Sequence, residues 1–98
     1  MSSPPTNREA VILDLLVSGE KYGRELNREY ANRTGKGMPA GSLYTTLQRM
    51  EDKGFIRSRH GEPVPERGGH PRRYFRITGA GHDALHFVQA TLLKGVTA

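Results

Sequence analysis

Six arginines lie close together between residues 57 and 76. They are Arg57, Arg59, Arg67, Arg72, Arg73 and Arg76, and the same segment holds only two acidic residues, Glu62 and Glu66. Guanidinium groups this close repel one another unless something compensates, so the segment predicts contact with a polyanion. A basic loop of this kind can hold backbone phosphates or enter the minor groove of DNA.

A second set of residues, just before these arginines, could contact base edges. A helix over residues 40–53 would turn Leu43, Leu47 and Met50 to one side. The opposite side then carries small or polar residues: Gly41, Ser42, Thr45, Gln48, Arg49 and Asp52. Short outward side chains let a helix sit close in the major groove, which admits one α-helix. Tyr44 lies at the edge of the apolar stripe, so core packing and DNA contact are both open to it.

Other motifs predict neither a cofactor nor catalysis. Residues 79–84 match the dinucleotide pattern G-x-G-x-x-G/A, but no second strand and no acidic residue about 20 positions on accompany them. His82 and His86 stand four apart without a third metal ligand, so we expect a solvated pair. No nucleophile, base and orienting group form a recognisable set. We therefore expect no enzyme, no cofactor and no metal site.

These residues need a small set of elements to position them. Thr6 and Glu9 form a capping-box pattern that opens a helix running to about residue 18. A second helix is predicted over 22–33, a Gly- and Pro-containing break at 35–39, and the helix over 40–53. Strands follow at 55–60 and 72–77, joined by a long loop, and Thr78 caps a last helix over about 78–94 that Gly95 ends. Three helices, a two-stranded wing hairpin and a C-terminal helix make an α+β winged helix-turn-helix fold.

The first and last helices are more apolar than one small core requires. Only Asp14 interrupts the apolar ring of the first helix, and the last helix has a broad apolar face. We therefore predict a two-fold homodimer. The expected contacts are Leu13, Val17, Phe87 and Leu92.

Composition is consistent with this scheme. The chain has 98 residues and a formal net charge of +5, room for one domain over 7–98 behind a disordered lead at 1–6. The charge suits DNA, RNA or an anionic membrane, and no apolar run approaches the ~20 residues of a bilayer span. The sequence has no cysteine, which excludes disulfides and thiolate zinc sites, and residues 1–6 lack the features of a signal peptide. A cytoplasmic location is the expectation.

Three blocks of sequence resemble the PadR-like family of winged helix-turn-helix regulators. The first runs from Leu13 to Leu26, the second from Gly41 to Ile56, and the third from Pro71 to Gly81. The resemblance covers about residues 9–90, nearly the whole chain. It implies a repressor dimer that binds an inverted repeat and releases it on a signal, with Tyr44 at the DNA surface. Relatives often bind a small-molecule effector near the dimer interface, but many also continue beyond the last helix, which puts such an effector in doubt here.

The predicted site has two parts on duplex DNA. Base recognition falls to Ser42, Tyr44, Thr45, Gln48 and Arg49, and phosphate contact to Lys36, Arg57, Arg59, Arg67, Arg72 and Arg73. One alternative is a protein-interaction module that uses the same scaffold without DNA, and another is an RNA-binding winged helix. Duplex binding with a steep dependence on salt would separate the first alternative from the DNA function.

Overall fold

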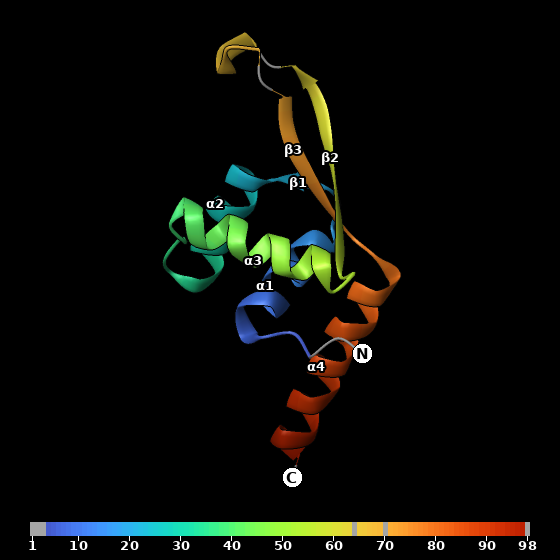
Figure 1. The fold of residues 1–98 in the computed structure, drawn as a ribbon. Helices are drawn as coiled ribbons and strands as arrows, with labels where there is room; N and C mark the ends of the chain where they lie inside the picture. The colour runs from blue at the N-terminus through green and yellow to red at the C-terminus, as the bar shows by residue number, and fades with distance from the viewer. Residues whose placement is uncertain (1–3, 64, 70, 98) are drawn as a thin grey trace.

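The computed structural model describes the backbone of residues 4–63, 65–69 and 71–97, and the side chains of these residues except 67 and 93–97. Helices α1 (Asn7–Leu16), α2 (Gly23–Thr34) and α3 (Ala40–Asp52) form the body of the molecule. Strands β2 (Ile56–Pro63) and β3 (Pro71–Ile77) form a long hairpin, the wing, with a short helix η1 (Pro65–Arg67) near its tip. The wing and α4 (Gly79–Thr97) extend from opposite ends of the body (Figure 1). This arrangement confirms the predicted winged helix-turn-helix architecture.

The sheet contains a third strand, outside the hairpin, that the sequence did not predict. Strand β1 (Lys21–Tyr22) pairs with β3, placing Lys21 opposite Phe75 and Tyr22 opposite Tyr74, so the sheet order is β1-β3-β2. A two-residue strand shows no alternation in sequence, and its pairing depends on a segment more than 50 residues away. The predicted two-stranded wing hairpin is present, and β1 extends its sheet along the other edge of β3.

Several predicted boundaries also shift. The two wing strands are longer than expected, with Arg57 facing Arg76 across the hairpin, so the connection between them is shorter. Helix α1 ends two residues before the expected stop at Ser18. Helix α2 ends at Thr34 and is capped by Gly35, which adopts a left-handed conformation with φ of 93°. Helix α4 continues through Gly95 to Thr97, so that glycine does not end it.

The core forms where α1 meets the other elements. Ile12, Leu13, Leu15 and Leu16 of α1 are all buried, against Leu26 of α2, Leu43, Leu47 and Met50 of α3, Phe75 of β3 and Leu85 of α4. One domain thus covers several sides of α1, although its sequence predicted that a second subunit would be needed. Leu13 has no exposed surface at all. Its predicted role as a dimer contact was wrong, because a residue buried in the monomer core cannot reach a partner.

Side-chain hydrogen bonds cap the first turns of α1 and α4. The Thr6 hydroxyl accepts from the Glu9 amide at 3.1 Å, and the Glu9 carboxylate accepts from the Thr6 amide at 3.0 Å, which confirms the predicted capping box. The same carboxylate binds Lys53 Nζ at 2.8 Å, so it also ties α1 to the end of α3. Thr78 caps α4 as predicted: its hydroxyl accepts from the Gly81 amide at 3.0 Å and donates to the Gly54 carbonyl at 2.6 Å.

No helix in the described ranges has both the length and the apolar character that crossing a bilayer requires.

Candidate nucleic-acid interface

Helix α3 turns a polar face outward, as its sequence predicts. Leu43, Leu47 and Met50 are buried, together with Thr46, whose hydroxyl donates to the Ser42 carbonyl at 2.8 Å. The candidate base-contacting residues are exposed on the opposite side: Ser42, Thr45, Gln48 and Arg49. The buried stripe holds the helix against the body and leaves these four side chains available to a ligand.

The outward residues differ in their freedom. Gln48 donates from Nε2 to Asp52 Oδ1 at 3.0 Å, one turn further along the helix, so it must exchange this bond to contact a base. The Arg49 side chain makes no hydrogen bond or ion pair within the described part of the chain. Its guanidinium can therefore engage a ligand without breaking an existing contact.

Tyr44 packs against α2 on one side and is partly exposed on the other. Its side of α3 faces the start of α2, where a Cβ atom on Gly23 would lie only 2.6 Å from the Tyr44 hydroxyl oxygen. Yet 42% of Tyr44 remains exposed. A side chain at Gly23 would push Tyr44 away, so this glycine permits the close approach of α2 and α3.

The wing arginines divide into paired and open groups. Arg59 forms two hydrogen bonds with the Glu20 carboxylate, one from Nε at 2.9 Å, and lies over the Tyr74 ring. The hydrogen bond from Arg59 lowers the pKa of Glu20 below its ordinary value, and the reciprocal bond raises the pKa of Arg59. Arg59 must therefore share its charge with Glu20 in any phosphate contact.

Among the arginines predicted to contact phosphate, Arg73 has partners on two other elements of its own chain. It donates to Glu51 at 2.8 Å and to the Ser58 hydroxyl at 3.0 Å, and its guanidinium lies near the Phe75 ring. These contacts join β3 to α3 and β2, which is a structural role. Arg57, by contrast, is exposed and has no hydrogen-bond or ion-pair partner among the described residues, so it is available for phosphate contact.

The remaining predicted phosphate residues lie in three different places. Arg72 stacks its guanidinium over the Tyr22 ring at 4.4 Å. Its Nε is buried and lacks a hydrogen-bond partner among the described residues. Lys36 is exposed in the α2–α3 connection, where its carbonyl accepts from the Thr34 hydroxyl at 3.1 Å. The side chain of Arg67 lies outside the described residues.

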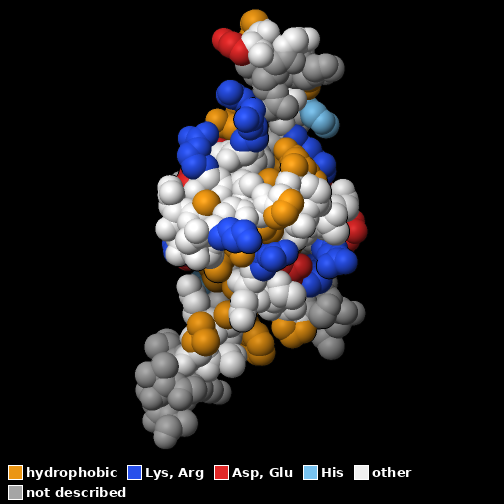
Figure 2. All heavy atoms as spheres, turned by 90° about the vertical axis from the view of Figure 1, so that its left-hand side faces the viewer, with side chains coloured by type: hydrophobic (Ala, Val, Ile, Leu, Met, Phe, Trp, Pro, Cys, Tyr) orange, Lys and Arg blue, Asp and Glu red, His pale blue; other side chains and the backbone are white. Residues whose placement is uncertain are grey.

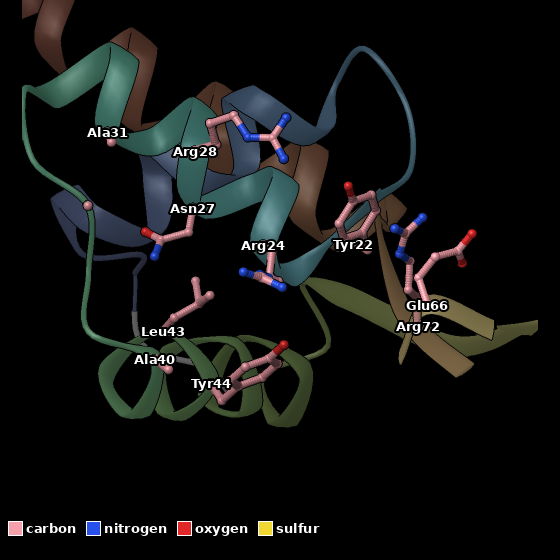
Figure 3. A pocket seen from close by; sticks show the side chains of 11 residues that line it. Tyr22, Arg24, Asn27, Arg28, Ala31, Ala40, Leu43, Tyr44, Glu66 and Arg72 are labelled. Atoms are coloured by element: carbon pink, nitrogen blue, oxygen red, sulfur yellow. The ribbon is translucent and has the colours of Figure 1, made fainter. Parts of the chain in front are cut away.

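A cleft of about 710 Å³ between α2, the start of α3 and the wing adds residues that sequence reasoning missed. Arg24 and Arg28 project from α2, Tyr44 from α3, and Arg72 and Glu66 from the wing (Figure 3). The spacing of four residues between Arg24 and Arg28 places both on one side of α2 and could have pointed to them. Their position opposite the wing could not be inferred from that spacing.

Asn27 holds the α2–α3 connection beside this cleft. Its Nδ2 donates to the Met38 carbonyl at 2.7 Å, and its Oδ1 accepts from the Met38 amide at 2.8 Å. One side chain thus satisfies both backbone groups of a residue eleven positions away. This clamp sets where α3 begins relative to α2.

Positive charge spreads over the side of the molecule that holds the wing and the ends of α2 and α3. Figure 2 shows Lys and Arg side chains at the base of the wing and across the middle of this face, with acidic side chains sparse among them. Hydrophobic side chains are scattered between them and continue lower down, where this view shows no Lys or Arg side chain among the described residues.

The other residues predicted at a dimer interface are exposed. Val17 is 51% exposed, Phe87 60% and Leu92 65%, which are high fractions for large apolar side chains. His82 and His86 have ring centroids 6.5 Å apart, and the described residues contain no group of three or more His, Cys, Asp or Glu able to hold a metal ion.

Comparison with known proteins relates this architecture to transcriptional regulators. The model of the transcriptional regulator PadR-like family matches residues 12–87. The fold is similar to that of a transcriptional regulator from Clostridium thermocellum, with 29% identity, a TM-score of 0.72, and coverage of 92% of this chain and 85% of that one. A PadR-like transcriptional regulator from Bacillus cereus shows 28% identity, a TM-score of 0.73, and coverage of 91% and 84%.

A sequence relative shares most of the same region. An uncharacterized protein from Lysinibacillus sphaericus is 33% identical over an alignment of 75 residues, and the match covers 74% of this chain. The match spans 66% of the length of that relative.

Proposed function

Because the chain belongs to the PadR-like family and is therefore a DNA-binding transcriptional regulator, not an enzyme, we propose that it represses transcription as a homodimer on an inverted-repeat operator. The observation that supports this proposal most is that the exposed polar face of α3 adjoins the wing, whose arginines include some without a side-chain partner among the described residues. A helix that reads bases beside a hairpin that holds phosphates is the arrangement that winged-helix DNA recognition uses.

Base recognition is proposed for Ser42, Tyr44, Thr45, Gln48 and Arg49. Arg49 is the strongest of these, because a free guanidinium can form two hydrogen bonds with guanine O6 and N7. Phosphate contact is proposed for Lys36, Arg57 and Arg72, with Arg67 retained from its sequence position. Arg59 and Arg73 have a weaker claim, since each already binds a carboxylate of its own chain.

Dimer formation is proposed through the exposed apolar residues of α4, Phe87 and Leu92, together with Val17 at the end of α1. A two-fold dimer would present two α3 helices, and a two-fold protein matches an operator whose half-sites form an inverted repeat. A small-molecule effector at this interface is proposed as a subsidiary property. A ligand screen by thermal shift, followed by DNA affinity measurements with each compound found, would test it.

Selection from random duplex DNA tests the main proposal. We expect an enriched inverted repeat that binds far more tightly than a scrambled duplex, with affinity falling steeply as salt rises. No enrichment, together with salt-insensitive binding, would contradict the proposal and favour a protein-interaction module. Preference for RNA over duplex DNA in the same assay would favour an RNA-binding winged helix.

A further inference from the structure

Among the described residues, the cleft beside α2 is lined by more basic than acidic side chains. These are three arginines, Arg24, Arg28 and Arg72, and one carboxylate, that of Glu66. The side chains of Arg24 and Arg28 are exposed and make no hydrogen bond or ion pair within the described residues. Three arginines that converge on one cleft from two elements repel one another unless an anion joins them.

Arg72 supplies an independent sign that an acceptor is missing. Its guanidinium is held over the Tyr22 ring at 4.4 Å, and its buried Nε has no hydrogen-bond partner among the described residues. Buried donors are nearly always satisfied in folded proteins, so an unpaired one at the wall of a cleft marks a place for a bound acceptor.

The start of α3 adds further donors at the same cleft. Ala40, the first residue of α3, lines the cleft, and the preceding Pro39 has no side-chain group that could cap the helix. The first amides of a helix lack partners within the helix and carry the positive end of its dipole. The guanidinium groups and these amides suit the same ligand, a tetrahedral oxyanion.

We propose that this cleft binds one backbone phosphate of the operator DNA through Arg24, Arg28 and Arg72, and that Glu66 at the wing tip opposes its entry. The inference rests on the proposed function and adds α2 to the DNA-binding surface. Duplex DNA is favoured over a free anion because the cleft opens between the two elements proposed to hold the duplex, α3 and the wing. Glu66 carries the same charge as the phosphate and lines the same cleft, so it lowers the affinity of the free protein for DNA.

Alanine substitutions on α2 test the phosphate contact. Arg28→Ala and Arg24→Ala should each weaken binding to the selected operator about tenfold, the loss of one charge-assisted hydrogen bond. Each should also reduce the slope of log affinity against log salt by about one. Arg8→Ala, which removes an exposed arginine of α1 outside the cleft, is the matched control and should change neither quantity. Circular dichroism melting would verify that all three variants fold.

Neutral phosphate analogues identify the occupant. A series of operators, each with one methylphosphonate, should contain a position at which the wild-type protein loses affinity and Arg28→Ala loses little more. Independent losses at every position would overturn the proposal. Inorganic phosphate that shifts the NMR signals of Arg24 and Arg28, while their substitution leaves DNA binding unchanged, would assign the cleft to a free anion and would also overturn it.

Removing the carboxylate tests the opposing role of Glu66. Glu66→Gln should tighten operator binding about threefold, the size expected for one exposed charge pair, whereas Glu62→Gln on β2 should have a smaller effect. Equal effects of the two substitutions would overturn this part of the proposal.

If the wild-type protein selects no duplex at all, the proposed function itself fails. If it selects an operator and Arg24→Ala and Arg28→Ala match Arg8→Ala, only the cleft inference fails.

Discussion

Arginine chemistry in this protein depends on what each guanidinium already touches. Arg59 and Arg73 are engaged by Glu20 and Glu51 of their own chain, whereas Arg49 and Arg57 have no partner within the described residues. The sequence alone does not distinguish the paired arginines from the unpaired ones, because the fold determines which of them lie beside a carboxylate. Substitution of Arg49 and Arg57 is therefore the most direct test of the proposed division between base recognition and phosphate contact.

Arg49→Ala should reduce discrimination more than overall affinity. Bidentate pairing of an arginine with guanine contributes about 1–3 kcal/mol of discrimination, so the gap between operator and scrambled duplex should narrow by that amount. Fluorescence anisotropy on the two duplexes measures it. A variant that weakens both duplexes equally would place Arg49 on a phosphate instead.

Arg57→Ala is the complementary change on the wing. A phosphate contact carries little sequence information, so both duplexes should weaken together and the salt slope should fall by about one. A salt titration of Arg57→Ala beside Arg49→Ala makes each variant the control for the other. Relaxed specificity in the wing variant and unchanged specificity in the helix variant would reverse the two roles.

The Glu20–Arg59 pair should leave a signature in pH titration. The hydrogen bond from Arg59 lowers the pKa of Glu20, so the pair contributes stability above the ordinary carboxyl pKa and loses it as pH falls through the lowered value. NMR titration should show the Glu20 pKa below its ordinary value in the wild type and returned to it in Arg59→Ala. An unchanged Glu20 pKa in that variant would show that the pair does not form in solution.

At the scale of elements, the contact of α4 with the turn before β2 needs a glycine. A Cβ atom on Gly81 would lie 2.2 Å from the Phe55 carbonyl oxygen, whereas one on Gly79 would have nothing within 4 Å. This close approach explains one glycine of the dinucleotide-like pattern without any nucleotide. Packing therefore requires Gly81, whereas it does not require Gly79, the first glycine of the pattern.

Gly81→Ala and Gly79→Ala form a matched pair. Gly81→Ala should lower the free energy of unfolding by about 2–3 kcal/mol, because backbone must move to admit the methyl group. Gly79→Ala at the first position of the same helix should be neutral or slightly stabilising, since alanine favours helix. Urea unfolding of both variants measures the difference, and equal stabilities would contradict the packing described for Gly81.

How much of each element could be predicted depends on the range of its interactions. The faces of α3 and the caps at Thr6 and Thr78 follow local periodicity and short hydrogen bonds, and the sequence predicted them. Strand β1 and the Asn27 clamp on Met38 depend on segments that only the fold brings together, and the sequence did not predict them. Leu13 shows a third limit, because an apolar ring around a helix does not reveal whether its own domain or a partner covers it.

The molecule is 53 Å in its longest extent, and the proposed DNA-binding and dimer surfaces lie at different positions along that length. The wing extends from one end and α4, with its exposed apolar residues, from the other, while α3 crosses the body between them (Figure 1). A partner on α4 would leave the wing and α3 uncovered. Dimer formation and DNA binding can therefore proceed on the same protomer without competing for surface.

Charge on α4 should dissociate the dimer. Phe87→Glu and Leu92→Glu place a carboxylate where 60% and 65% exposed apolar side chains are proposed to meet a second copy, so each should raise the monomer–dimer dissociation constant at least about tenfold. His86→Glu adds the same charge to an exposed position of α4 about 100° around the helix from Phe87, and serves as the control. Sedimentation velocity across a concentration series measures the assembly, and anisotropy on a full operator and a single half-site measures the consequence. Binding to the full operator should fall toward half-site affinity in the two glutamate variants only. A wild-type protein that sediments as a folded monomer at high micromolar concentration would contradict the dimer, and half-site binding by α3 and the wing would then have to account for recognition alone.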